Sequence, residues 1–159
     1  MARVLKILTA PNLILRKKSD MIDFKRIKKN ELEKLLKDME MTMKKNDGVG
    51  LAAPQIGKNI RIVVINVKSG TIFMINPKIT RKSILKEIGE EGCLSVPDVF
   101  GKVKRHKNIN CKYFDLSGKE IRLKSEGLLA RVIQHELDHL DGILFIDKAT
   151  DIVTEKKNG

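Results

Sequence analysis

The sequence predicts an α+β fold in which antiparallel sheets pack around a central helix. Two observations support this fold class. The β-branched apolar segments are short and are joined mostly by turns, and amphipathic helical segments stand before and after them. The chain has no internal repeat or linker, so we expect a single domain over residues 1–159. An apolar content of 42% and a charged content of 33% are those of a folded protein rather than a disordered one.

The first predicted helix follows a short apolar start and a basic, irregular stretch. Asn30 is predicted to be its N-cap, because Glu33 follows at the spacing of a capping box. Leucine and methionine side chains then recur at helical spacing, which predicts a face turned to the core. Asp47-Gly48 is predicted to end this helix.

A small, apolar and glycine-rich stretch comes next, with the sequence G-V-G-L-A-A-P-Q-I-G over residues 48–57. Gln55 is its one side chain that carries both a hydrogen-bond donor and an acceptor. The stretch lacks the Lys-Ser/Thr ending of a phosphate-binding loop, which excludes that mode of nucleotide binding. Two interpretations remain. Either a ligand approaches this backbone closely, or the stretch is a tight turn with Gln55 on the surface.

The middle of the chain is predicted to form strands joined by turns. The predicted strands are residues 61–67, 71–75, 102–114 and 120–123. Ser69-Gly70 is expected to turn between the first two, and Pro77 to end the second strand or to mark a sheet edge. The tail from Asp147 is short and polar, and about its last ten residues are expected to be mobile.

The two cysteines need separate explanations, because a cytosolic chain does not keep disulfides. Cys93 has a glycine before it and a proline four residues after it, which predicts a bend between extended segments. Its thiolate could be a metal ligand, a nucleophile or a simple buried thiol. Cys111 alternates with charged neighbours in a strand pattern and is predicted to be structural. His106 lies in a basic strand and is predicted to be a surface residue.

The net charge of +12, from 32 basic and 20 acidic residues, favours an anionic neighbour such as nucleic acid or a ribosome surface. The alternative is a generally basic solvated surface, since the lysines are spread along the whole chain. Few aromatic residues and no Trp argue against a base-stacking platform and sequence-specific nucleic-acid binding. With no signal-like segment and no run of membrane-spanning length, we expect a cytoplasmic protein without a membrane partner.

The sequence Q-H-E-L-D-H near the C-terminus contains H-E-x-x-H within a helical pattern. Residues four apart share a helical face, so His135 and His139 can point at one metal ion. Glu136 can handle protons without occupying a metal position. Ser125 is the predicted N-cap of this helix and Gly142 its predicted stop. The alternative is a buried helix whose histidines are only hydrogen-bonded.

Three stretches of the chain match motifs in a fixed order. Residues 48–55 match G-x-G-x-A-A-x-Q, residues 91–95 match E-G-C-L-S, and residues 134–139 match Q-H-E-x-D-H. Together they resemble the three signature motifs of the peptide deformylase family, which implies that family's sheets around a metal-bearing helix. The E-G-C-L-S form resembles the main bacterial type. The tail after Asp147 is shorter than the C-terminal helix of many bacterial relatives, so a ribosome contact through that helix is not carried over.

The resemblance implies a metal-dependent hydrolase in which Cys93 joins His135 and His139 as the third ligand. Two imidazoles and one thiolate leave a tetrahedral position open for water, as a catalytic site requires. The family implies Fe²⁺ as the physiological ion, with Zn²⁺ or Ni²⁺ possible in the isolated protein. The sequence does not decide between them, because such a site suits several divalent ions.

The implied substrates are N-formylmethionyl nascent peptides, and the implied products are formate and a free N-terminal methionine. A bound metal ion lowers the pKa of water toward neutrality. Glu136 would accept the proton of that water and deliver it to the leaving amine. The Gln55 amide and the Leu94 backbone N–H would stabilise the charge that develops on the formyl oxygen.

The substrate pocket can be outlined in the same way. Leu128 and Val132 precede His135 by one or two turns on one helical face, which predicts an apolar wall beside the metal. An unbranched methionine side chain would fill such a pocket. Val49 resembles a family pocket residue. The backbone around Val49, Gly50 and Gly89 is expected to pair with an extended peptide as a strand would. Arg105 matches a basic position and is expected to meet the peptide further along.

Two other classes of protein compete with this interpretation. Metallo-endopeptidases also use H-E-x-x-H, but usually with a third ligand downstream, and Asp141, Asp147 and Asp151 do not fit such spacing. A non-catalytic protein that binds RNA or the ribosome could carry a purely structural metal. A structural site would be closed by a fourth protein ligand.

Overall fold

The structure, a computed structural model, describes residues 1–155 and confirms the α+β fold class. Its helices are α1 (Lys29–Lys45) and α2 (Gly127–Leu140), with short 3₁₀ turns η1 (Leu13–Arg16), η2 (Ala53–Ile56) and η3 (Phe145–Asp147). The strands are β1 (Gly50–Ala52), β2 (Ile62–Val67), β3 (Gly70–Lys82), β4 (Lys86–Cys93), β5 (Val96–His106), β6 (Asn108–Phe114), β7 (Glu120–Glu126) and β8 (Thr150–Thr154). None of the helices within residues 1–155 has the length and apolar character needed to cross a membrane.

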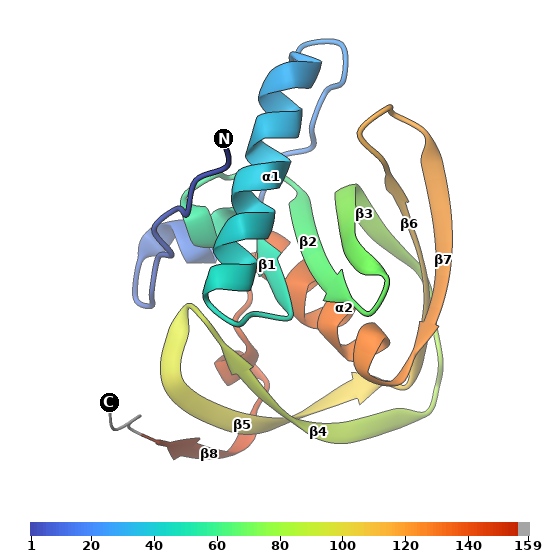
Figure 1. Ribbon diagram of the computed structural model, residues 1–159. Coiled ribbons are helices and arrows are strands. Elements are labelled where there is room, and N and C mark those ends of the chain that lie inside the picture. The colour runs from blue at the N-terminus through green and yellow to red at the C-terminus, as the bar shows by residue number, and fades with distance from the viewer. Residues whose placement is uncertain (156–159) are drawn as a thin grey trace.

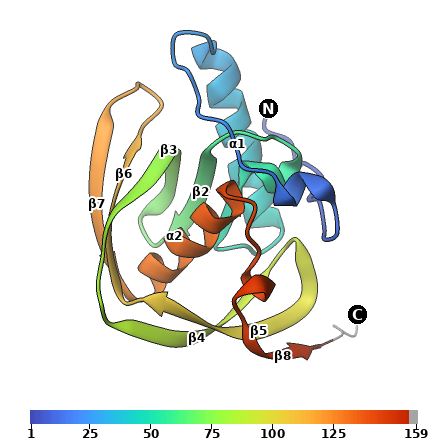
Figure 2. The same cartoon turned by 180° about the vertical axis from the view of Figure 1, so that it is seen from behind.

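The strands form two antiparallel sheets with α2 between them (Figure 1). One sheet has the strand order β1-β2-β3-β6-β7, and the other has the order β4-β5-β8. The chain leaves the first sheet at the end of β3 and continues directly into β4, so this connection joins the two sheets (Figure 2). Helix α1 lies on the other face of the five-stranded sheet (Figure 1).

Strand β2 shows why both faces of the larger sheet are covered. Successive side chains of a strand point to opposite faces. Val63 and Ile65 belong to the buried cluster around α2, whereas Ile62 and Val64 belong to the buried cluster around α1. The four residues are at most 1% exposed. The continuous apolar run of β2 is therefore explained by burial on both faces.

Helix α2 follows the predicted pattern closely, but its start differs. Ile133 and Leu140 are fully buried in the core, as their helical spacing predicts. Ser125 lies in β7 and does not cap the helix, because Glu126 is the residue at the N-cap position. Gly142 follows the helix with φ +74, and a Cβ there would collide with the backbone of η1, so the predicted stop is correct.

Helix α1 also begins at a different residue from the one predicted. Lys28 occupies the N-cap position and makes no side-chain cap, while Asn30 lies inside the first turn. Glu33 does not close a capping box; it pairs with Lys37 at 3.1 Å. Burial of Leu32 and the other apolar residues of this helix fixes its position, and tertiary packing of this kind outweighs a capping preference.

Strand β3 continues through Pro77, so the expectation that this proline ends the strand is wrong. The alternative of a sheet edge is closer, because the pairing with β2 stops at Ile75 and the rest of β3 pairs only with β6. The register against β6 shifts between Ile75 and Lys78, and Asn76 has φ 51 at this irregularity. A β-bulge takes residues out of the regular ladder, and Pro77 can be accommodated there although it has no N–H to donate.

The C-terminal segment is more ordered than its polar composition predicts. Residues 150–154 form β8, which pairs with β5 in the smaller sheet. Asp147 ends η3, where its carboxylate accepts a hydrogen bond from the Leu144 N–H at 2.9 Å. The expectation of a mobile tail is therefore wrong for β8, and its remainder over residues 156–159 lies outside the described residues.

Candidate active site

A cavity of about 390 Å³ opens beside α2 and contains most of the predicted site residues. Its walls come from the loop between α1 and β1 with the start of β1, from η2, from the end of β4 and the turn after it, from the first part of β5, and from one face of α2. Its lining includes Gln55, Cys93, His135 and Glu136. Segments far apart in the sequence therefore meet at this point.

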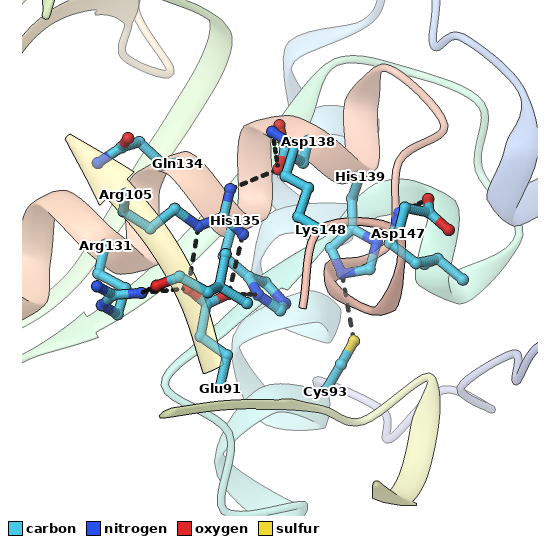
Figure 3. A network of polar contacts seen from close by, with 12 residues as sticks. Glu91, Cys93, Arg105, Arg131, Gln134, His135, Asp138, His139, Asp147 and Lys148 are labelled. Atoms are coloured by element: carbon cyan, nitrogen blue, oxygen red, sulfur yellow. Dashed lines mark hydrogen bonds and ion pairs between the residues drawn. The ribbon is translucent and has the colours of Figure 1, made fainter. Parts of the chain in front are cut away.

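Three candidate metal-ligand atoms converge at this cavity: Cys93 and His135 line it, and His139 lies next to them outside the lining. Cys93 ends β4, and His135 and His139 lie one turn apart on α2. Their ligand atoms all lie within 4.8 Å of one another, and Cys93 Sγ is 3.3 Å from His139 Nε2 (Figure 3). One thiolate and two imidazoles suit Zn²⁺, Fe²⁺ or Ni²⁺. Within residues 1–155 the group has these three members and no fourth, which fits an open catalytic site better than a closed structural one.

Glu91 completes the environment of the histidines, and sequence reasoning missed it. Its Oε1 accepts a hydrogen bond from His135 Nδ1 at 2.8 Å, which leaves Nε2 of that ring for the metal. Arg105 donates two hydrogen bonds of 2.9 Å to Glu91, and Arg131 donates one of 2.7 Å (Figure 3). Burial alone would raise the pKa of Glu91, but hydrogen bonds from Arg105 and His135 hold it well below its usual range.

A sequence signal for Glu91 did exist. It precedes Cys93 by two residues, and residues two apart on a strand point to the same face. A carboxylate that shares the face of a candidate metal ligand is a natural partner for a metal-bound histidine.

Glu136 lies beside β1 with its carboxylate in the cavity. It is 3% exposed, and its Oε2 has no hydrogen-bond partner within residues 1–155. Burial raises the pKa of Glu136 to about 7. Gly50 permits this placement, because a Cβ at that position would lie 2.6 Å from Glu136 Oε1. A buried oxygen without a partner, near three candidate metal-ligand atoms, is the arrangement expected where a water and an ion would bind.

Gln55 is buried at 1% exposure, so the interpretation of it as a surface residue is wrong. Its Oε1 accepts the Ala52 N–H at 2.9 Å, and its Nε2 donates to Ser95 Oγ at 3.1 Å and lies 3.6 Å from Cys93 Sγ. The amide group is thus held in place with its NH₂ toward the candidate metal group. Ser95 is a second residue that sequence reasoning missed, although it lies in the E-G-C-L-S motif. Leu94 lines the cavity in the turn after Cys93.

The predicted substrate-pocket residues differ in position. Val49, Gly50, Leu128 and Val132 all line the cavity. Val49 and Leu128 are 55% and 71% exposed, so they present apolar surface at its mouth. Gly89 does not line the cavity; a Cβ there would meet the Arg131 guanidinium at 2.9 Å.

Arg105 is placed differently from the expectation. Its side chain is 4% exposed and bridges Glu91 to Asp138, whose Oδ2 lies 2.6 Å from Arg105 Nη1 (Figure 3). It does not line this cavity, so the expected contact with the peptide is wrong. The basic residue on the cavity wall is Arg131, which sequence reasoning also missed.

The other cysteine and histidine lie outside this group. Cys111 is 1% exposed in the core beside α2, where burial raises its pKa to about 11, in agreement with a structural role. His106 is half-buried rather than fully on the surface, and its Nδ1 lies 2.7 Å from the Ser83 carbonyl oxygen.

Comparisons with known proteins agree with this geometry. The sequence profile of the polypeptide deformylase family matches residues 4–155. A peptide deformylase of Thermoanaerobacter pseudethanolicus is 51% identical over 77% of this chain and 77% of its own length. One of Caldicellulosiruptor bescii is 46% identical over 96% of this chain and 89% of its own.

Solved structures extend the comparison to the fold. A class I type b peptide deformylase from Acinetobacter baumannii superposes with a TM-score of 0.90 at 36% identity, over 92% of this chain and 100% of that one. The peptide deformylase from Thermotoga maritima gives a TM-score of 0.88 at 39% identity, over 93% and 99%. The chain therefore belongs to the peptide deformylase family, whose members are hydrolases that remove the N-formyl group from nascent peptides.

Proposed function

We propose that this chain performs the family reaction with Cys93, His135 and His139 as ligands of one divalent ion and with Glu136 as the proton carrier. The observation that supports the proposal most is that three ligand atoms lie within 4.8 Å of one another. Two of them, from Cys93 and His135, line the cavity that also holds Glu136, whose Oε2 has no partner within residues 1–155. The substrates are N-formylmethionyl nascent peptides, and the products are formate and a free N-terminal methionine.

Fe²⁺ is the proposed physiological ion, and Zn²⁺ or Ni²⁺ would fit the same three atoms. When bound, such an ion supplies Lewis acidity toward water and toward a carbonyl oxygen. Glu91 prepares His135 for this role, because an ionised carboxylate at Nδ1 fixes the tautomer and orients the ring. Affinity alone does not choose the metal, since availability also matters.

Proton transfer and stabilisation of the developing charge are assigned to different residues of the chain. Glu136 accepts the proton of the attacking water and delivers it to the leaving amine. The Gln55 amide and the Leu94 backbone N–H stabilise the negative charge that develops on the formyl oxygen. The hydrogen bonds of Gln55 to Ala52 and Ser95 support this role, because they fix the amide before substrate binds.

Substrate selection is proposed to rest on Val49, Leu128 and Val132, which give the cavity an apolar wall suited to a methionine side chain. The peptide backbone is proposed to pair with neighbouring strands. β1 and β4 are both edge strands, so each has one side free of a sheet neighbour. Gly50 and Gly89 lie on these two edges.

The test combines metal content with product analysis. Protein purified without oxygen, freed of metal and reloaded with Fe²⁺, Zn²⁺ or Ni²⁺ should bind one ion per chain and release formate from a formyl-Met peptide, fastest with Fe²⁺. Cys93→Ser should lose metal affinity, and the matched variant Cys111→Ser should keep it. The ligand set is wrong if Cys111→Ser loses the metal while Cys93→Ser retains it. Cleavage of internal peptide bonds without a formyl requirement would favour an endopeptidase instead.

The basic charge of the chain also suggests a macromolecular partner besides the peptide substrate. We propose that the protein associates with the ribosome surface, where nascent peptides emerge. The net charge of +12 supports this, since basic proteins are drawn to polyanions over distances set by ionic strength.

A further inference from the structure

A second cavity, of about 570 Å³, lies on the other side of α2, between the end of β3 and the strands β4 and β5. Its fourteen lining residues include seven Lys or Arg and two Asp. Figure 2 shows the corner where the chain passes from β3 into β4, next to α2. We call this the basic cavity.

The acidic residues of the basic cavity are already neutralised. Asp138 pairs with Arg105 at 2.6 Å and with Lys148 at 3.0 Å (Figure 3). Asp141 pairs with Arg61 at 3.0 Å. The remaining cations of the wall therefore act without a local counter-charge from these two residues.

Four lysines of the wall, Lys78, Lys82, Lys86 and Lys104, have no ion pair with any of residues 1–155. They come from three strands, and all four are exposed. A concave surface with several like charges and low-dielectric walls focuses its field and raises the local concentration of anions. These side chains do not contribute to the buried clusters, so packing of the core does not account for their grouping on one wall.

We propose that the basic cavity binds the phosphodiester backbone of RNA without reading its sequence. Lysine ammonium groups bind phosphate as point charges. The wall contains no Phe, Tyr or Trp, and its one aromatic ring is the imidazole of His106, whose Nδ1 lies 2.7 Å from the Ser83 carbonyl oxygen, so it offers no platform for stacking successive bases. Its only apolar lining residues are Pro77, Ile79 and Leu137, which do not form a groove for an apolar peptide. The wall of the cavity is concave, so it fits the convex phosphate backbone of RNA better than a lipid surface, which is nearly flat.

This inference rests on the proposed ribosome association and names the surface responsible for it. The two cavities use different sides of α2: His135 and Glu136 line the first, while Gln134 and Asp138 line the second. Docking RNA against the basic cavity therefore leaves the first cavity open to a peptide. Because the two cavities have different lining residues, RNA docking and deformylation can be tested with separate variants.

The experiment compares two variants with equal net charge. In the cavity variant, Lys78, Lys82, Lys86 and Lys104 are all changed to Gln. In the control variant, four exposed lysines without ion pairs, Lys25, Lys29, Lys34 and Lys68, are changed to Gln. Each variant lowers the net charge from +12 to +8. The probes are two fluorescent RNA hairpins of unrelated sequence and about 16 base pairs.

We expect the native protein to bind both hairpins equally, with an affinity that falls steeply as salt rises. The cavity variant should bind at least about tenfold more weakly, and its salt dependence should be shallower by roughly one unit of slope for each phosphate that no longer meets a lysine. The control variant should bind less than about threefold more weakly than the native protein, and both variants should hydrolyse a free formyl-Met peptide like the native protein.

Several results would overturn the proposal. Equal weakening of RNA binding in the two variants would mean a general charge effect. No RNA binding by the native protein at physiological salt, or tighter binding to anionic vesicles through the same lysines, would also reject it. Binding of inorganic phosphate but not RNA would assign the cavity to a small anion. If no metal form released formate while the RNA result held, the proposed function would fail and the docking surface would stand.

Discussion

The two cavities beside α2 share one helix but organise charge in opposite ways. The first cavity, which contains Gln55, Cys93, His135 and Glu136 and is called the catalytic cavity below, is lined by five acidic residues and one arginine, whereas the basic cavity has seven Lys or Arg and two Asp. In the first, Glu91 is fixed by three partners. In the second, four exposed lysines have no ion pair within residues 1–155. Chemistry requires groups held in one geometry, while attraction of a polyanion requires only the sign and density of charge.

This contrast predicts that conservative changes in the catalytic cavity have large effects, and the largest is expected at Glu136. Glu136→Gln preserves the size of the side chain but removes its ability to carry a proton, so activity should fall about 10²–10⁴-fold. Metal content should stay normal, because Glu136 is not among the three candidate ligands. Formate release and metal analysis on the same samples measure both. Retention of most of the activity would show that another group transfers the proton.

Gln55→Leu should have the next largest effect. It removes the amide donor at similar size, and kcat should fall by about 10²–10³ with a smaller change in KM, because the contact strengthens as the formyl oxygen gains charge. Gln55→Glu should be at least as harmful, since a carboxylate repels the developing oxyanion. Ser95→Ala serves as the control, because it removes the partner of Gln55 Nε2 but leaves the donor. A change in KM alone, or loss of metal alone, would assign Gln55 a positioning role instead.

Glu91→Gln should act through the metal. It removes the charge that orients His135, so metal affinity should fall by about 10–100-fold. Glu87→Gln is the matched control, because Glu87 is exposed in the same strand and does not line the cavity. Competition with a chelator measures the affinity of each variant. Equal affinities in the two variants would contradict the role given to Glu91.

The apolar mouth of the catalytic cavity should give the smallest effect. The value of kcat/KM should be higher for a formyl-Met peptide than for a formyl-Gly peptide. The difference should correspond to about 1–3 kcal/mol of transition-state binding. Leu128→Ala should reduce this preference. Leu85→Ala should not, because Leu85 is 70% exposed, much like Leu128, but lies outside the cavity. Equal kcat/KM for both peptides would refute the pocket.

Helical periodicity and short motifs were sufficient to predict much of this molecule. The spacing of His135 and His139 on a helix with a buried apolar face, and the bend at Cys93, follow from local rules. The hydrogen bonds of Glu91 do not, because they join residues up to 44 positions apart. Sequence alone also hides whether a basic residue is buried. Arg105 resembles any other cation of a basic strand until Glu91 and Asp138 enclose it.

The errors at the edges of elements have a common physical cause. Local preferences predict a strand end at Pro77 and a mobile tail, but a bulge in β3 and the pairing of β8 with β5 determine the structure at these places. The basic cavity was not foreseen for a related reason. Its four lysines are spread over three strands, and the path of β3 into β4 together with the pairing of β4 with β5 brings them to one wall.

The placement of α2 between two cavities also has a consequence for how this family can vary in length. Inserting one residue between His135 and His139 would rotate everything beyond it by about 100°. That rotation would move His139 away from Cys93 and Asp138 away from Arg105 at once. A surface helix absorbs such a shift by fraying at one end, but this helix has contacts on both sides and cannot. Insertions and deletions should therefore be tolerated in the turn over residues 115–119 and excluded from α2, whatever residues they introduce.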